Sequence, residues 1–390
     1  VMGSEGYLIN QFLVEATNNR SDHWGGSYKN RMRFPIEIVR QIREACGPDF
    51  VIMYRLSMLD LVPNGSSWEE VIQLAKAIET AGANVINTGI GWHEARIPTI
   101  ATLVPRGHFS FVTEKLKGSV NVPLVATNRF NNPETCEEAL REGAADLISM
   151  ARPFLADPEI VNKSETNRSD EINTCIGCNQ ACLDHIFKRK VATCLVNPRA
   201  SHEGTWPLLA QALNPRRVAV VGSGPAGLSA AMEAARLGHH VELFEESAMI
   251  GGQFNLAKTI PGKEEFHETL RYFQRMLSKL QVKVHLNRHV SADDLSSQFD
   301  SVILATGIRP RSWNIPGLKG QGISVGYTAV LKNEITVGTR VAIIGAGGIG
   351  FDVADYLTHD GDASFSNAWG IDQDLSSRGG LVKPGSRASK

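Results

Sequence analysis

The chain has 390 residues, 42% of them hydrophobic and 21% charged, with a formal net charge of -1. This length allows two or three buried cores. The balanced charge gives no reason to expect nucleic acid or an anionic membrane as a partner. The sequence shows no run of about 18 apolar residues, and it opens on Val1 without a charged-then-apolar leader. We therefore expect a cytoplasmic protein that does not span a membrane.

Short apolar runs alternate with amphipathic stretches between about residues 50 and 150, and the runs number four. This alternation predicts a parallel βα repeat, and therefore an α/β fold. Polar residues follow the expected strands, at the end where (β/α)8 barrels build their active sites. Four units cannot close a barrel, and the sequence begins without an initiator methionine. Residues 1–156 are therefore expected to be the C-terminal half of a (β/α)8 TIM barrel, and the chain a fragment.

Four of the six cysteines lie close together in an irregular, polar stretch, residues 157–215, which is predicted to be a linker. They are Cys175, Cys178, Cys182 and Cys194. In a reducing compartment such a group indicates metal ligands before disulfides. The C-x2-C-x3-C spacing with one distant cysteine favours a 4Fe-4S cluster, whereas zinc sites more often show two separate C-x2-C pairs. Structural zinc remains the alternative.

A glycine turn that binds a dinucleotide is predicted after the apolar run at 217–221. Gly222, Gly224 and Gly227 open a helix, and Glu245 ends the next expected strand. The glycines permit the tight turn and the approach of a pyrophosphate, and the acid suits the ribose hydroxyls. Gln253 follows where related flavoproteins contact the flavin ring. The assignment is FAD, supported by the VILATG run at 302–307.

A second glycine turn consists of Gly345, Gly347 and Gly350 after another apolar run. It is expected to hold a nicotinamide dinucleotide, because one chain seldom binds two FAD molecules in adjacent units. The stretch after residue 360 is polar, rich in Gly and Ser and without period, so no second strand is expected there. The domains predicted after the linker are an FAD-binding domain, 216–335, and a partial NAD(P)H-binding domain, 336–390.

Several motifs together resemble the old yellow enzyme group, and most closely the bacterial 2,4-dienoyl-CoA reductase family. The motifs are GSEGYLIN (3–10), RSDHWGGSYKNRMRF (20–34), YRLS (54–57), INTGIGWHEARIP (86–98), TNRF (127–130), SMARPFLADP (149–158), CIGCNQACLD (175–184) and IPGKEEFHETLRY (260–272). The resemblance covers nearly the whole chain. Trimethylamine dehydrogenase shares this architecture, but its family passes electrons to a separate flavoprotein. The second glycine turn here instead resembles a working NADPH site.

The resemblance implies a role for each candidate residue. Tyr7 would donate a proton, with His93 as its partner and Glu5 as a helper. Arg55 would lie near the flavin ring of FMN. The expected FMN phosphate site is Arg129 and Arg152, with Ala151 beside them. The residues expected to touch an acyl-CoA substrate are Glu94, Arg96 and Ile97.

The implied reaction is NADPH-dependent reduction of 2,4-dienoyl-CoA, with electrons passing from FAD through the 4Fe-4S cluster to FMN. This reaction serves β-oxidation of unsaturated fatty acids. Two alternatives remain: an amine dehydrogenase or enone reductase of the same architecture, and an inactive fragment or zinc-stabilised binding module. Half a barrel leaves open strand edges, so we expect the chain alone to retain little FMN and to be poorly soluble.

Overall fold

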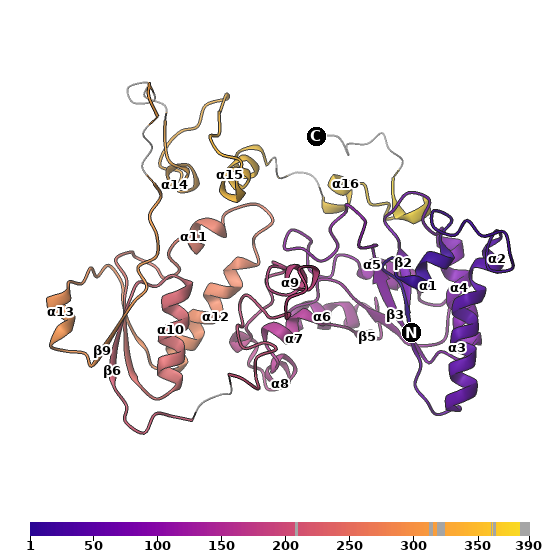
Figure 1. Cartoon of the computed structure of the whole chain (residues 1–390), viewed down its shortest axis with the longest axis horizontal. Helices are drawn as coiled ribbons and strands as arrows, with labels where there is room; N and C mark the ends of the chain where they lie inside the picture. Colours follow the sequence, from indigo (N-terminus) through magenta and orange to yellow (C-terminus); the bar gives the residue numbers. More distant parts are fainter. Residues whose placement is uncertain (207–209, 312–314, 318–323, 360, 362–363, 383–390) are drawn as a thin grey trace. The chain divides into compact units, whose positions relative to one another are not determined.

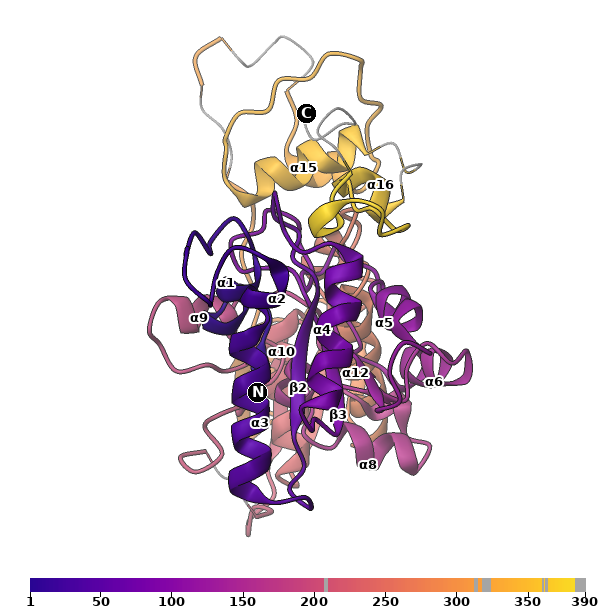
Figure 2. The same ribbon diagram turned by 90° about the vertical axis from the view of Figure 1, so that its right-hand side faces the viewer.

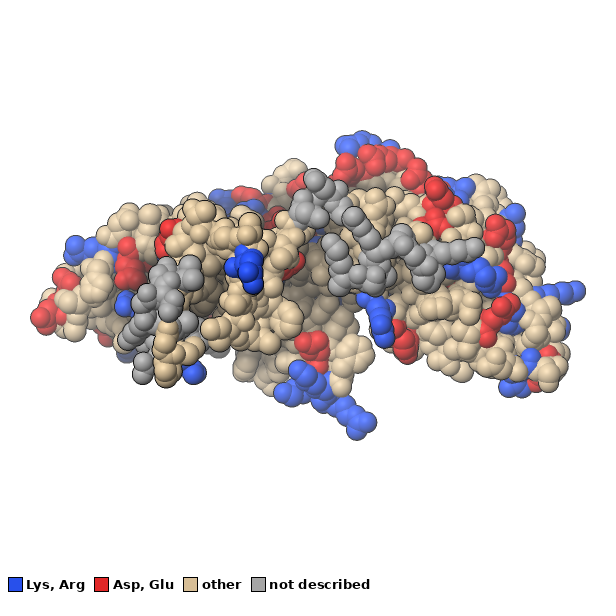
Figure 3. Space-filling model, turned by 90° about the horizontal axis from the view of Figure 1, so that it is seen from above, with Lys and Arg blue, Asp and Glu red and all other residues tan. Residues whose placement is uncertain are grey.

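The computed structural model describes residues 1–206, 210–311, 315–317, 324–359, 361 and 364–382. The chain divides into two compact units. The first comprises Val1–Phe154 with Gly361–Lys390, and the second comprises Leu155–Asp360. Within the described ranges, no helix is both long and apolar enough to cross a membrane. On the face drawn in Figure 3, acidic and basic side chains are interspersed, as the near-zero net charge suggests.

The first unit is built on a parallel sheet with the strand order β1-β2-β3-β4-β5 (Figure 1). The strands are β1 (Met2–Gly3), β2 (Met53–Leu59), β3 (Val85–Ile90), β4 (Leu124–Ala126) and β5 (Leu147–Ile148). The last four are the predicted repeat, which matches a TIM-barrel-type domain. β1 was not predicted, because two residues are too few to show a period.

Helices cover this sheet and supply its core. α4 packs on β2, and Figure 2 shows α3 and α4 running alongside it. Tyr54 and Leu56 of β2, Ile78 of α4 and Ile86 of β3 are almost fully buried. Ser67 caps α4 in a reciprocal pair of hydrogen bonds with Glu70, which fixes where the helix begins. The helices are α1 (Leu8–Leu13), α2 (Tyr28–Arg31), α3 (Arg33–Cys46), α4 (Trp68–Thr80), α5 (Ser110–Leu116) and α6 (Pro133–Arg141); α7 (Arg152–Ala156) lies at the boundary between the units.

The described residues 364–382 belong to the first unit, not to the predicted NAD(P)H-binding domain. They contain α16 (Phe365–Trp369) and the 3-10 helix η2 (Arg378–Gly380). Phe365 meets the ring of His108 edge-on at 4.8 Å, and Ile371 lies in the core of this unit. The Gly379 carbonyl accepts a hydrogen bond from the Leu61 amide at 2.9 Å. Scattered apolar side chains therefore anchor these residues in the first unit without any sequence period. Residues 383–390 lie outside the described part.

The second unit contains a parallel sheet with the order β8-β7-β6-β9, and α10 and α12 lie on one face of it (Figure 1). β9 pairs with β6 from Val218–Ser301 to Val221–Leu304, so the VILATG run at 302–307 begins in a strand beside β6. The strands are β6 (Arg217–Val221), β7 (His240–Phe244), β8 (Lys283–His285) and β9 (Ser301–Leu304). The helices are α8 (Ile160–Glu165), η1 (Ser169–Glu171), α9 (Leu183–Phe187), α10 (Pro225–Arg236), α11 (Phe254–Ala257), α12 (Phe266–Lys279), α13 (Ala292–Ser296), α14 (Tyr327–Leu331) and α15 (Gly348–Thr358).

The apolar run at residues 341–345, before the second glycine turn, does not form a strand, although the helix after it is present. These residues have no regular secondary structure, and Val341 and Ile344 are 50% and 60% exposed. A strand needs a neighbouring strand to receive its backbone hydrogen bonds. The described residues provide none at this position, so the apolar pattern alone does not produce a strand.

Candidate functional site

Two loops at the carboxyl ends of β1 and β3 bring the predicted proton donor and its partner together. The Tyr7 hydroxyl and His93 Nε2 lie 2.9 Å apart. Their rings are 5.1 Å apart at 74°, and Tyr7 is 50% exposed. A phenol and an imidazole in this contact can pass a proton between solvent and a bound molecule. The geometry suits the predicted roles, which remain a prediction.

The loop that carries Tyr7 is held against the loop that carries His93. Glu5 and Gly6 have φ angles of 56° and 78°, so the chain turns sharply before Tyr7. A Cβ on Gly6 would lie 3.1 Å from the Trp92 ring and 3.0 Å from Glu94 Oε2. Glycine therefore meets two needs here: a left-handed backbone and close approach of the neighbouring loop.

Glu5 forms an ion pair with Arg55 of β2 on the same edge of the sheet. Arg55 Nη2 and Nε lie 2.8 and 3.0 Å from Glu5 Oε1. The Glu5 side chain is 12% exposed and that of Arg55 35% exposed. The predicted flavin contact and the predicted helper are thus partners, which fixes the guanidinium in one position. No sequence pattern indicated this pairing, because the two residues are 50 positions apart.

Asn87 of β3 is a polar residue of this edge that sequence reasoning missed. It is the register partner of Arg55 and is 5% exposed. Within the described part of the chain, its Oδ1 accepts no hydrogen bond. A buried, unpartnered acceptor costs free energy unless a ligand donates to it. The edge formed by Arg55 and Asn87 therefore fits a polar cofactor such as the flavin of FMN. The available signal was the amide of Asn87 directly after two apolar residues in the expected strand VINTGI.

The two predicted phosphate ligands, Arg129 and Arg152, both contact the loop after β3. Arg129 has a φ of 61°, is 5% exposed and donates from Nε to the Val104 carbonyl at 2.8 Å. Arg152 donates from Nη1 to the Ile100 carbonyl at 3.0 Å. Two guanidinium groups that contact the same loop suit a dianionic phosphate. Ala151 immediately precedes Arg152 at the start of α7.

The residues predicted to touch substrate differ in their exposure. Glu94 and Arg96 are exposed beside His93, as a contact with a bound molecule requires. Ile97 instead packs against the core of the first unit. An apolar side chain committed to the core has less surface left for a ligand, so the arrangement gives Ile97 weaker support than its two neighbours.

The first glycine turn of the second unit has the geometry of a dinucleotide site. Gly222 has a φ of 97°, and a Cβ on Gly227 would lie 1.9 Å from the Gly222 carbonyl oxygen. Space is open around a Cβ built on Gly224, where α10 begins. The open space before the helix N-terminus is where a pyrophosphate would approach. These three glycines therefore fit the predicted FAD.

Glu245, at the end of β7, is hydrogen-bonded by the glycine turn itself. Its carboxylate accepts from the Ser223 amide at 2.9 Å, the Ser223 hydroxyl at 2.6 Å and the Ser247 amide at 2.8 Å. Burial opposes ionisation of Glu245, but these hydrogen bonds outweigh it and lower its pKa. A carboxylate has about four acceptor sites. Three of them are occupied by these hydrogen bonds, so one remains for the ribose contact predicted for Glu245.

Gln253 lies near the same turn. Its Nε2 donates to the Ile308 carbonyl at 2.5 Å, and its Oε1 accepts from the Tyr327 hydroxyl at 3.3 Å. A Cβ on neighbouring Gly252 would lie 3.2 Å from Gly224 Cα. The segment predicted to contact the flavin ring is thus packed on the glycine turn and tied to the chain that follows β9.

The second glycine turn repeats the first. Gly345 has a φ of 118°, and a Cβ on Gly350 would lie 2.2 Å from the Gly345 carbonyl oxygen. Gly347 precedes α15 with φ -88° and ψ -178°, close to the -67° and 175° of Gly224 before α10. The turn therefore has dinucleotide-binding geometry although the strand before it is not formed.

The four clustered cysteines influence one another electrostatically. Burial is the main cause that raises the pKa of Cys194 to about 11, and charge on Cys175 and Cys178 contributes. Burial also raises the pKa of Cys178, with contributions from Cys175 and Cys182. Four thiols are chemically suited to a metal centre. No group of three or more His, Cys, Asp or Glu side chains arranged for a metal ion is found in the described ranges, however. The 4Fe-4S cluster therefore stays a prediction.

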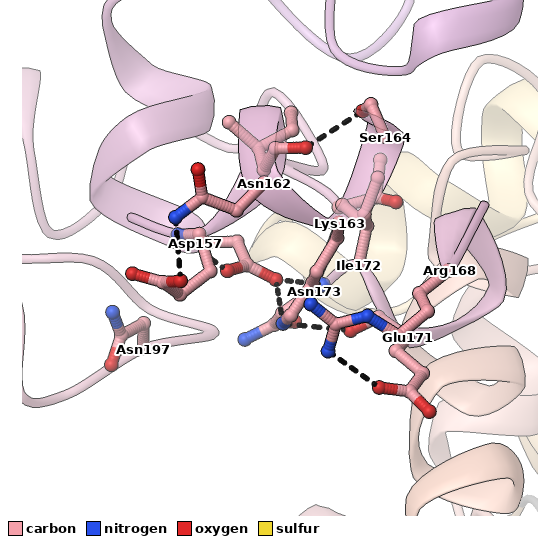
Figure 4. A network of polar contacts seen from close by, with 12 residues as sticks. Asp157, Asn162, Lys163, Ser164, Arg168, Glu171, Ile172, Asn173 and Asn197 are labelled. Carbon is pink, nitrogen blue, oxygen red and sulfur yellow. Dashed lines mark hydrogen bonds and ion pairs between the residues drawn. The ribbon is translucent and has the colours of Figure 1, made fainter. Parts of the chain in front are cut away.

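A buried polar network holds the two cysteine-bearing segments together (Figure 4). The Asn173 amide donates to Asp157 Oδ2 at 2.8 Å, and Asn173 Nδ2 donates to the Val196 carbonyl at 2.8 Å. Asn173 precedes Cys175, and Val196 follows Cys194. Lys163 donates to Asp157 at 2.6 Å. These bonds join the tight cysteine motif to the distant cysteine.

Glu171 ties the same segment to α12. Its carboxylate pairs with Lys279 at 2.6 Å, Arg275 at 3.2 Å and Arg168 at 3.4 Å, and its side chain is 4% exposed. The hydrogen bond from Lys279 is the main cause that lowers the pKa of Glu171 below its usual value. A carboxyl group whose pKa is lowered by folding stabilises the fold above its unfolded pKa. That stabilisation is lost as the pH falls through the folded pKa.

We therefore expect Glu171→Gln to lower the free energy of unfolding by about 1–3 kcal/mol at pH 7. The difference from the unchanged protein narrows as the pH falls through the folded pKa of Glu171, which lies below the usual glutamate value. Thermal unfolding at pH 7 and at the lowest pH at which both proteins remain folded measures this, with exposed Glu165→Gln as the control. An equal difference at both pH values would show that the ion pairs do not stabilise the fold.

The chain is similar to known oxidoreductases over most of its length. Residues 1–171 match the NADH:flavin oxidoreductase / NADH oxidase family, and residues 216–364 match pyridine nucleotide-disulphide oxidoreductase. A metal reductase from Desulforamulus reducens is 37% identical over 366 residues, which cover 93% of this chain and 54% of that protein. An NADH oxidase from Thermoanaerobacter brockii is 36% identical, covering 92% and 56%. The chain thus spans about half the length of the curated relatives it matches.

Solved structures show the same relationship. A 2-naphthoyl-CoA reductase in complex with 2-naphthoyl-CoA matches with a TM-score of 0.88 and 34% identity, covering 92% of this chain and 55% of that one. Histamine dehydrogenase from Rhizobium sp. 4-9 matches with a TM-score of 0.75 and 27% identity, covering 86% and 50%. By its two matched domains and these relatives, the chain is similar to flavin-dependent oxidoreductases, with an α/β fold that includes an NADH:flavin oxidoreductase-type TIM-barrel domain and a pyridine nucleotide-disulphide oxidoreductase domain.

Proposed function

We propose that the chain is the catalytic and electron-transfer part of an NADPH-dependent reductase of conjugated enoyl-CoA thioesters, with 2,4-dienoyl-CoA as substrate. The contact between Tyr7 and His93 carries the proposal. Reduction of a carbon–carbon double bond conjugated to a carbonyl requires a proton as well as a hydride. An amine dehydrogenase removes hydrogen from its substrate and needs no proton donor to carbon, so this contact favours the reductase.

Each cofactor has residues of this chain that would hold it. Arg55, Arg129, Ala151 and Arg152, with Asn87, would hold FMN. Gly222, Gly224, Gly227, Glu245 and Gln253 would hold FAD, and Gly345, Gly347 and Gly350 would hold NADPH. Cys175, Cys178, Cys182 and Cys194 would hold the 4Fe-4S cluster. When bound, these groups supply hydride and single-electron transfer.

The residues near the substrate would act on protons and charge. Tyr7 would give its hydroxyl proton to the α-carbon of the thioester while the thioester oxygen gains charge. His93 would return a proton to the phenolate through the 2.9 Å contact. Glu5 would hold Arg55 in place, and exposed Glu94 and Arg96 would contact the acyl-CoA.

The relatives offer substrates for the test. They include a 2-naphthoyl-CoA reductase, a cinnamate reductase and a dimethylamine dehydrogenase. We expect anaerobic NADPH oxidation with 2,4-dienoyl-CoA to exceed that with cinnamate, and no oxidation of dimethylamine. Faster turnover of cinnamate would identify an enone reductase of the same architecture. Dimethylamine-dependent reduction of the flavin would identify an amine dehydrogenase.

A further inference from the structure

Asp60, directly after β2, is a buried carboxylate that neither the sequence motifs nor the proposed reaction explains. It is 2% exposed. Its Oδ1 accepts hydrogen bonds from Ser57 Oγ at 2.7 Å, Trp92 Nε1 at 2.9 Å and Asn10 Nδ2 at 3.2 Å. Its Oδ2 accepts from the Ser66 amide at 2.7 Å. These four donors are neutral, and a buried carboxylate needs several such donors to replace water.

Two of the four donors lead to the two residues of the candidate proton relay. Asn10, from α1, also accepts a hydrogen bond at its Oδ1 from the Gly6 amide at 2.9 Å, and Gly6 immediately precedes Tyr7. Trp92 immediately precedes His93. The Trp92 amide donates to the Asp60 carbonyl at 3.0 Å, so Asp60 is hydrogen-bonded to both the backbone and the side chain of Trp92.

We propose that Asp60 is the positioning residue that sets the distance between Tyr7 and His93. One carboxylate oxygen accepts from Asn10, behind the Tyr7 loop, and from Trp92, beside His93. Asp60 itself touches neither member of the pair. The positioning follows from the hydrogen bonds alone, and its consequence for turnover rests on the proposed function.

The substitution Asp60→Asn changes the charge and the hydrogen-bonding pattern of the side chain while it keeps the side-chain volume. The carboxylate accepts three donors at Oδ1 and one at Oδ2, so an amide of the same shape must point its NH2 group at one of these sets. The NH2 group then faces an N–H or O–H donor, and at least one hydrogen bond is lost in either orientation. With the NH2 group at the three-donor side, the two loops are no longer joined through one acceptor; with it at the Ser66 side, they are joined only by an uncharged and therefore weaker acceptor.

The first readout needs neither cofactor nor substrate. The ¹⁵N and ¹H resonances of the His93 imidazole report its contact with Tyr7, and Tyr7→Phe defines the spectrum without that contact. We expect Asp60→Asn to shift the His93 resonances toward those of Tyr7→Phe. Ser57→Ala is the matched control: it removes a donor from the same oxygen, but Ser57 lies in β2 and joins neither loop. It should leave the His93 resonances unchanged.

If Asp60→Asn does not fold, Trp92→Phe tests the same link, because it keeps an aromatic side chain at this position and removes the indole N–H together with part of the ring system. It should shift the His93 resonances in the same direction. The unchanged spectrum of His93 in a folded Asp60→Asn or Trp92→Phe protein overturns the proposal.

The second readout is turnover of the holoenzyme with the dienoyl thioester. We expect Asp60→Asn to lower kcat by roughly 10²-fold with little change in KM or flavin content, since misplacement of a catalytic group by about 1 Å costs this much. If Tyr7→Phe leaves turnover unchanged, the proposed function fails, and the spectra still decide whether Asp60 positions the pair. If the spectra shift and only Asp60→Asn leaves kcat unchanged, the positioning has no catalytic consequence and that part of the proposal is wrong.

Discussion

Replacing Tyr7 with phenylalanine should lower the turnover of a conjugated enoyl thioester by roughly 10²–10⁴-fold, the usual contribution of a general acid. The substitution keeps the ring, which lies 5.1 Å from that of His93, and removes only the hydroxyl at 2.9 Å from His93 Nε2. Binding of FMN should be unchanged, because Arg55, Arg129 and Arg152 are untouched. Stopped-flow kinetics measure the two half-reactions separately.

The effect should be confined to the half-reaction that consumes the thioester. Reduction of the flavins by NADPH involves no proton donation to carbon and should proceed at the unchanged rate. Phe111→Leu, at a half-buried position of α5 away from the relay, controls for a general effect of an aromatic change in this unit. If Tyr7→Phe reduces the thioester at the normal rate, Tyr7 is not the proton donor.

Replacing Gly227 with alanine should abolish FAD binding. A Cβ at this position would lie 1.9 Å from the Gly222 carbonyl oxygen, far inside van der Waals contact. The clash is with backbone, so α10 must move away from β6, and the helix N-terminus leaves the place where it would meet the pyrophosphate. We expect less than about a tenth of the unchanged FAD content, measured by absorbance after release of the flavin.

Gly224→Ala is the matched control for this substitution. Gly224 lies in the same turn, and a Cβ built there meets no atom of the protein within 4 Å. The variant should fold normally. Any loss of FAD binding should come only from contact between the added methyl group and the bound pyrophosphate. Normal FAD content in Gly227→Ala would contradict the assignment of this turn.

Local pattern predicted much of the fold, because each element carries its own period. The parallel strands β2 to β5 and the unit β6–α10–β7 follow from apolar runs, amphipathic helices and glycine spacing. The same reasoning failed at residues 341–345, because an apolar run becomes a strand only beside a partner. It gave no indication of the packing of residues 364–382, where Ile371 and Leu375 are buried and Phe365 is partly buried without forming a period.

The candidate site shows the same limit. Resemblance identified Tyr7 and His93, and the structure places them in contact. No motif indicated that Glu5 pairs with Arg55, that Asn87 has a buried unpartnered oxygen, or that Asp60 joins two loops. These relations depend on the parallel order of the strands, which brings together residues 32 to 50 positions apart.

The most direct test of the proposed electron path is the metal content of anaerobically purified protein. The account predicts about four irons and four acid-labile sulfides per chain, and an electron paramagnetic resonance signal after reduction. The substitution Cys194→Ser should lower the iron content, because it removes the ligand that the network through Asn173 joins to the other three. One zinc per chain without sulfide would contradict the account and show that the four cysteines are structural.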